Sequence, residues 1–176
     1  MSESNSNEHT GDDGLEVLEV IAPTGVENVL AWGLRPESEV FWVFFCTGDA
    51  GNQHPAPGSV ETFWTAQARC EAAARVCPDA LLSIHARVGR GPAQHVEVAR
   101  VGNAACEAGG GCRFVVGFVP PGRPTYAVVR VTSSGRLEAV LARLACLRAL
   151  FPRVNWNVGD YQDGGKVAVP PRGRLA

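Results

Sequence analysis

The side chains that could support catalysis or metal binding are few and scattered along the chain. None of the six cysteines forms a Cys-x-x-Cys pair, so a zinc site would need ligands that the fold gathers from distant segments. The sequence contains no phosphate-binding loop and no Gly-x-Ser-x-Gly elbow. We therefore predict no catalytic residues, no metal site and no cofactor, and we interpret most of the cysteines as small core residues. A small enzyme with an unfamiliar site is the alternative that these residues leave open. The residues in question are Cys46, Cys70, Cys77, Cys106, Cys112, Cys146, His9, His54, His85 and His95.

A second group of residues suits binding rather than catalysis. Residues 59–78 predict a helix that packs on a sheet, with Ser59 as its N-cap and Pro78 as its end. This helix opens with a pair of large aromatic residues, Phe63 and Trp64. Core packing is the ordinary role of a residue such as Phe63. For Trp64 partner contact is equally open, because tryptophan is enriched at binding hot spots.

The overall charge predicts no general attraction to nucleic acid or to membranes. The formal net charge is −2, although the chain carries 15 arginines and a single lysine, Lys166. No apolar run approaches the ~20 residues that a membrane-spanning helix needs. The polar, acidic N-terminus has the pattern of neither a signal peptide nor a transit peptide. We therefore expect a cytoplasmic protein without membrane association, with a nuclear location also open.

The chain is predicted to form one domain with two tails. Residues 1–14 have the composition of a disordered acidic tail, residues 15–161 form the domain, and residues 162–176 form a loose C-terminal tail. We predict a loop at Thr47–Gly58 and a second helix at Gly135–Phe151, capped by Ser134. The apolar stripe of this helix comprises Leu137, Val140, Leu141, Leu144, Leu147 and Phe151, and should face the core. The predicted strands are Leu15–Ile21, Val26–Leu34, Val40–Cys46, Ala80–Val88, His95–Val101, Arg113–Val119, Tyr126–Thr132 and Val154–Val158.

This order of elements predicts an α+β fold, in which an antiparallel β-sheet carries two main helices on one face. The unbroken apolar run Val40–Cys46 is typical of a central strand. Ala80–Val88 alternates, so Leu82 and Ile84 should point to one face of the sheet and His85 to the other.

Two stretches, Phe41–Pro78 and Val115–Tyr161, resemble the eukaryotic translation initiation factor 4E family, whose members bind the mRNA cap. Phe41–Phe45, FWVFF, is similar to the family's strand of the type Trp-x-x-Trp-Phe-Phe. Val60–Trp64, VETFW, matches the Val-Glu-x-Phe-Trp sequence that opens the family's first helix. Val115–Tyr161 is similar to the family's last hairpin, third helix and closing strand. The resemblance implies a divergent, reduced 4E-like sandwich, because Val101–Arg113 is too short to hold the family's second helix.

The resemblance also implies a partner-binding surface. In the family, the valine and tryptophan of this helix opening receive a Tyr-x-x-x-x-Leu-type helix from the scaffold factor 4G or from its competitors. Val60, Phe63 and Trp64 are therefore the candidate partner-binding residues here. An apolar helix laid in a hydrophobic groove is a known recognition mode.

A cap site is implied in altered form. Cap binding in the family needs two stacked aromatic rings, a carboxylate, and basic residues on the phosphates. The loop in which the family keeps its first stacking tryptophan has none, and only His54 could replace it. His95 and Glu97 lie near the expected second ring and carboxylate, and Arg123 is the candidate phosphate ligand. Weak binding of capped RNA would therefore use a different pocket.

These observations predict a non-catalytic binding protein that docks a helical partner segment at Val60 and Trp64. Such a protein would take part in translation or another host pathway, or interfere with it. The alternative is an accessory or structural interaction protein of a virus, with an α+β fold, no cap or translation role, and the sheet face as its working surface.

Overall fold

The computed structural model describes residues 25–47, 52–89, 94–102, 112–124, 128–161 and 165–166. The predicted tail 1–14 and the predicted strand Leu15–Ile21 lie outside these residues.

The strands form two four-stranded antiparallel sheets rather than the single sheet that we predicted. The first has the strand order β2-β1-β3-β4 and the second has the order β6-β5-β7-β8. The predicted α+β class is confirmed, and β1 is a central strand as expected. The helices are α1 (Gly25–Ala31), α2 (Phe63–Val76) and α3 (Leu137–Leu150). The strands are β1 (Phe41–Thr47), β2 (Asn52–Glu61), β3 (Leu81–Arg87), β4 (His95–Gly102), β5 (Phe114–Phe118), β6 (Val129–Ser134), β7 (Trp156–Asp160) and β8 (Gly165–Lys166).

Strand β2 occupies most of the segment that we predicted as a loop, so that prediction is wrong. It contains Pro55 and Pro57, neither of which can donate a backbone hydrogen bond to a neighbouring strand. Because β2 lies at the outside of its sheet and pairs with β1 alone, it tolerates both prolines.

Helix α1 forms where we predicted a strand over Val26–Leu34, so that prediction is also wrong. Its buried residues, Gly25 and Val29, are four positions apart and therefore share one face of the helix. A Cβ atom at Gly25 would collide with the ring of Phe63, so this glycine lets α1 lie close to the first turn of α2.

The two longer helices start later than predicted. Thr62 rather than Ser59 is the N-cap of α2, and its Oγ1 accepts a hydrogen bond from the backbone N–H of Thr65 at 3.4 Å. Helix α3 begins at Leu137 and has no side-chain cap, although the Ser134 hydroxyl accepts a hydrogen bond from the N–H of Arg136 at 3.2 Å. The predicted apolar stripe of α3 does face the core, through Val140, Leu144 and Leu147.

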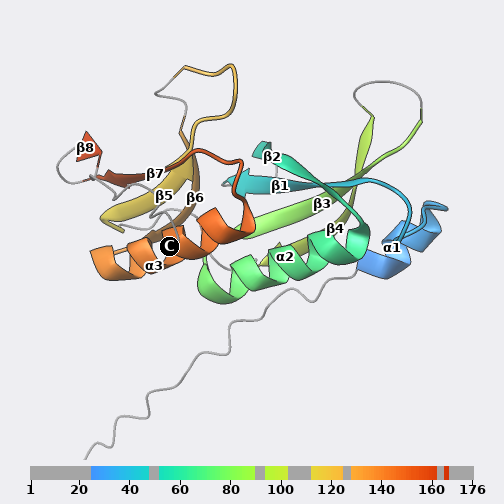
Figure 1. Cartoon of the computed structure of the whole chain (residues 1–176), viewed down its shortest axis with the longest axis horizontal. Helices are drawn as coiled ribbons and strands as arrows, with labels where there is room; N and C mark the ends of the chain where they lie inside the picture. The colour runs from blue at the N-terminus through green and yellow to red at the C-terminus, as the bar shows by residue number, and fades with distance from the viewer. Residues whose placement is uncertain are drawn as a thin grey trace, which may run out of the picture.

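Helices α2 and α3 cover the same side of the two sheets, and α1 lies at the end of this layer, beside the start of α2 (Figure 1). The ring of Phe45 on β1 joins the two halves of the core. It lies 5.2 Å from the ring of Phe118, 5.1 Å from that of Phe151 and 5.3 Å from that of Trp156. In the described part of the chain, no helix is long and apolar enough to cross a membrane.

A polar cluster centred on Asp79 fastens the second sheet to both helices. Asp79 follows α2 and accepts hydrogen bonds from the hydroxyl of Thr132 and from the backbone N–H of Ser133 on β6, the latter at 2.6 Å. The guanidinium of Arg143 on α3 lies 3.2 Å from the Asp79 carboxylate and also donates to the carbonyl of Ser133. The cluster therefore fixes the end of α2, strand β6 and helix α3 relative to one another.

Candidate functional site

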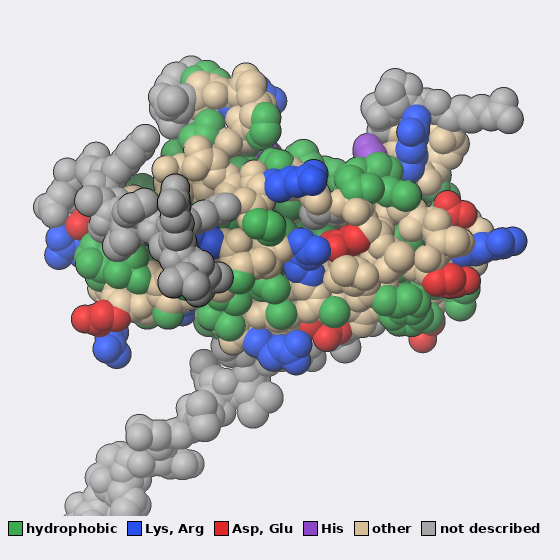
Figure 2. All heavy atoms as spheres, in the orientation of Figure 1, with side chains coloured by type: hydrophobic (Ala, Val, Ile, Leu, Met, Phe, Trp, Pro, Cys, Tyr) green, Lys and Arg blue, Asp and Glu red, His purple; other side chains and the backbone are tan. Residues whose placement is uncertain are grey.

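The junction between β2 and α2 exposes two large apolar side chains. Val60 is 54 % exposed and Trp64 is 51 % exposed. Hydrophobic side chains gather over this end of the helical layer, near α1 and the start of α2 (Figure 2). Exposed apolar side chains that gather into a patch are typical of binding surfaces.

Phe63 was predicted to contact a partner, and the structure corrects this prediction. Its ring is fully buried and packs edge-on against Phe41 at 5.5 Å, and its N–H donates to the carbonyl of Pro36 at 2.9 Å. The rings of Phe63 and Trp64 lie 5.5 Å apart at an angle of 68°. Phe63 therefore packs against Trp64 from the core side, and none of its side chain is accessible to a partner.

The two exposed side chains leave the junction in different directions. Val60 lies opposite Trp42 in the β1–β2 pair, and Glu61 lies opposite Phe41. Successive strand residues point to opposite faces, and Glu61 reaches Arg69 of α2 at 2.6 Å. Val60 therefore points away from the helix side of β2, and Trp64 is the principal apolar group on the outer surface of α2.

Arg69 ties together three elements beneath this surface. Its guanidinium donates to the Glu61 carboxylate at 2.6 Å and to the carbonyl of Leu150, at the end of α3, at 2.6 Å. It also lies over the ring of Phe151 at 5.6 Å. Burial raises the pKa of Glu61, while Arg69 works in the opposite direction. The second oxygen of Glu61, Oε1, is buried and has no hydrogen-bond partner among the described residues.

Helices α2 and α3 leave an open groove of about 430 Å³ between them, which we call the helix groove. Small side chains on both walls create it, because Ala68 on α2 and Ala149 on α3 do not fill the space. Its lining residues are Thr65, Ala68, Arg69, Ala149, Leu150 and Pro152.

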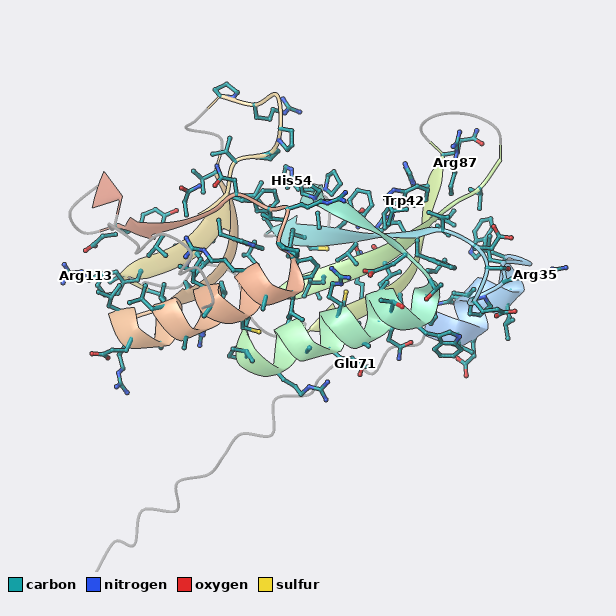
Figure 3. All side chains as sticks on the ribbon, in the orientation of Figure 1. Arg35, Trp42, His54, Glu71, Arg87 and Arg113 are labelled. Carbon is teal, nitrogen blue, oxygen red and sulfur yellow. The ribbon has the colours of Figure 1, made fainter. Side chains whose placement is uncertain are left out.

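The second group of predicted residues lies on the other side of the molecule, on the face of the first sheet that points away from α2. Here the ring of His95 meets that of Trp42 edge-on at 5.0 Å, and the ring of His85 lies 4.3 Å from that of Phe44. We call this aromatic and histidine-rich surface the outer sheet face. Trp42 and Arg87 lie on it, whereas Glu71 lies on the outer surface of α2 (Figure 3).

The carboxylate of Glu97 on the outer sheet face is already engaged by its neighbours. Arg100 donates to it at 2.5 Å and 3.1 Å, and the side-chain amide of Gln53 on β2 donates to it at 2.7 Å. The His85 Nε2 atom lies 3.8 Å away. Glu97 therefore ties β4 to β2, and a ligand would have to displace one of these donors to reach it.

His85 is held neutral in this cluster. Burial lowers its pKa to about 4, although Glu97 acts in the opposite direction. The same Nε2 atom lies 2.9 Å from the hydroxyl of Ser83, which is fully buried. A catalytic triad needs the nucleophile and the acid on different ring nitrogens. Ser83, His85 and Glu97 therefore do not form a triad.

The four candidate cap-binding residues fall into two pairs. His95 and Glu97 lie on β4, at the outer sheet face. His54 lies opposite Phe45 in the β1–β2 pair, so it leaves β2 on the other face from Gln53. Burial first, and then the charge of Arg123, lower the pKa of His54. His54 therefore lies on the opposite face of β2 from the Gln53–Glu97 hydrogen bond, where the charge of Arg123 acts on it.

Neither the half-buried position of Trp42 nor the helix groove was predicted from the sequence. The run Val40–Cys46 predicted a central strand without distinguishing its two faces, and Trp42 and Phe44 are half-buried on the outer sheet face. The signal that could have revealed this is the alternation of Phe41, Val43 and Phe45, which are all fully buried. The helix groove has no sequence signal, because it depends on alanines from two distant helices.

The described residues include no group of three or more histidine, cysteine, aspartate or glutamate side chains that could hold a metal ion. Comparison with known proteins finds no match among protein-family models, curated proteins or solved structures. The 4E-like assignment therefore rests on the motifs quoted above.

Proposed function

We propose that this chain is a non-catalytic binding protein that docks an amphipathic helical segment of a protein partner at the β2–α2 junction. The observation that carries this proposal is the exposure of Trp64, with half of its surface accessible on a rigid helix. Val60 points to the other side of the junction, so Trp64 is the anchor of this docking position. The Val-Glu-x-Phe-Trp resemblance supports a 4E-like role in translation, or interference with it, as the pathway in which such a partner would be found.

The structural setting of Trp64 supports this role. An anchor residue contributes most to the binding free energy when its conformation is fixed before binding, because less conformational entropy is then lost. Trp64 rests on the buried ring of Phe63, directly after the Thr62 cap. The partner would therefore meet a preorganised indole rather than a mobile side chain.

The test is binding of a synthetic amphipathic helix with a Tyr-x-x-x-x-Leu motif, measured by fluorescence anisotropy on the full chain. Trp64→Ala should weaken binding at least about tenfold, a loss typical of a hot-spot residue. Trp32→Ala is the matched control, because Trp32 is 55 % exposed and lies outside the junction. Equal affinities for the wild type and Trp64→Ala would refute the proposal.

A second function is favoured by one observation on the outer sheet face. Glu39, Val40, Trp42, Arg87 and Gly89 line an open pocket of about 560 Å³ beside the Trp42–His95 contact. This pocket supports the outer sheet face as a second binding surface, for which capped RNA is one candidate ligand.

Retention on an immobilised cap analogue tests the RNA role. If the predicted residues hold the ligand, Arg123→Ala should reduce retention, and Trp42→Ala should reduce it if the pocket takes part. An absence of retention for the wild type would remove the RNA role and leave the helix-docking proposal unaffected.

A further inference from the structure

The helix groove adjoins the proposed docking position directly. Trp64 and Ala68 are four residues apart on α2, so they are neighbours on one helical face, about 6 Å apart along the axis. Ala68 also forms one wall of the groove. A segment that contacts Trp64 and continues along α2 would therefore pass over the groove.

Hydrogen bonds hold the two walls of the helix groove in place. Arg69 on α2 donates hydrogen bonds to the Glu61 carboxylate and to the carbonyl of Leu150 in the last turn of α3, at 2.6 Å in each case. Its volume of about 430 Å³ lies within the range of ligand pockets, which is about 300–1,000 Å³. The lining is mainly apolar, with Ala68, Ala149 and Leu150 among its residues. One large aliphatic or aromatic side chain is the occupant that this space suits.

The charge at the edge of the helix groove determines which type of residue should follow the apolar side chain in the partner. Arg69 lines the groove with its side chain 26 % exposed, and the exposed Arg153 follows Pro152 at its edge. Gly58 has a positive φ of 76°, and a Cβ atom there would collide with the stem of Arg153, so this arginine lies against β2. The acidic group beside Arg69 is Glu61, which is buried, so the accessible charge at this edge is positive.

We infer that the helix groove is a second docking position for the same helical partner, and that it takes an apolar side chain followed by a carboxylate. This inference rests on the proposed function. The partner helix would place one apolar residue on Trp64 and a later one in the groove, and its acidic residue would lie at Arg69 and Arg153. Charge complementarity thereby gives the partner a fixed direction along α2.

The experiment compares two synthetic helical peptides on the full-length protein. The short peptide carries the Tyr-x-x-x-x-Leu motif alone, and the long one continues for roughly two more turns with a leucine and two glutamates. We expect the long peptide to bind about tenfold more tightly, which corresponds to about 1.4 kcal/mol. Ala149→Trp should abolish this gain and leave the affinity for the short peptide unchanged.

Two further variants keep the test interpretable. Ala142→Trp makes the same change about 10 Å earlier on α3, at an exposed position outside the groove, and should preserve the gain. Arg153→Glu should reverse the preference, so that an extension with lysines in place of the glutamates binds more tightly than the acidic one.

The outcomes separate the two proposals. If the short peptide binds through Trp64 but Ala149→Trp keeps the full gain, the inference is overturned and the proposed function stands. Binding of neither peptide would overturn both. Concentration-dependent self-association that Ala149→Trp abolishes would show that a second copy of this chain occupies the groove, which also overturns the inference.

Discussion

Acidification should destabilise this protein mainly through one buried histidine. His85 lies on β3 between the ring of Phe44 and the Glu97 carboxylate, and burial lowers its pKa from 6.5 to about 4. In the unfolded chain it binds a proton near pH 6.5, whereas the folded protein resists protonation until about pH 4. Between these values the unfolded state holds more protons, so stability is present above pH 6.5 and is lost as the pH falls.

The expected loss follows from these two pKa values. Each pKa unit corresponds to about 1.4 kcal/mol, and the full difference would amount to about 3 kcal/mol. Only part of it develops over a mild pH change, so the free energy of unfolding should fall by about 2 kcal/mol between about pH 7 and about pH 5. The groups that face the imidazole are Glu97, which opposes the shift, and His95 and Arg100, which add to it.

Urea denaturation at a series of pH values measures this loss. His85→Gln keeps a polar group near Ser83 but cannot titrate, so its stability should change much less over the same range. His95→Gln, at an exposed position on β4, serves as the control and should retain most of the wild-type loss. Equal losses of free energy for the wild type and His85→Gln, or an NMR titration of His85 near pH 6.5, would contradict this prediction.

Three other predictions test the packing. Asp79→Ala should lower the free energy of unfolding by about 3 kcal/mol, because it leaves a largely buried arginine without its partner; a loss below about 1 kcal/mol in urea denaturation would contradict this. Phe63→Ala should cost about 3–5 kcal/mol and Trp64→Ala clearly less, since only the first ring is fully buried; calorimetric melting curves in the reverse order would show that the assignment of core and surface is wrong. A thiol reagent at neutral pH should label Cys146 before Cys77, whose pKa burial raises to about 12; mass spectrometry showing equal labelling rates in the folded protein would refute this.

Elements with a strong periodic pattern were predictable from the sequence. The alternation in Ala80–Val88 predicted β3 because one face of that strand is buried against α2, and the apolar stripe of α3 predicted its core face. Helix α1 was missed because seven residues are too few to establish a period. Strand β2 was missed because proline and glycine indicate turns, and an outer strand is the exception to that rule.

The candidate sites were predictable only in part. The resemblance implied that Trp64 is exposed, and half of its surface is exposed in the structure, whereas the residue types alone left its role open. The engagement of Glu97 was not predictable, because Gln53 lies 44 residues away and reaches it only through the register of β1 with β2 and β3. For the same reason, residue types alone could not show that His54 leaves β2 on the opposite face.

In the described residues, the outer strands of both sheets are partly protected against an added strand from another chain. The prolines of β2 interrupt its row of backbone donors, and α1 lies along β4, with the amide of Asn28 donating to the carbonyl of Val98 at 3.1 Å. On β6 the backbone groups of Ser133 are already used by Asp79 and Arg143, and β8 has only two residues. Extension of the sheets by a foreign peptide or by a neighbouring copy is thereby disfavoured at each of these edges. Among the described residues, the helical layer and the outer sheet face therefore offer side chains, rather than free strand edges, to a partner.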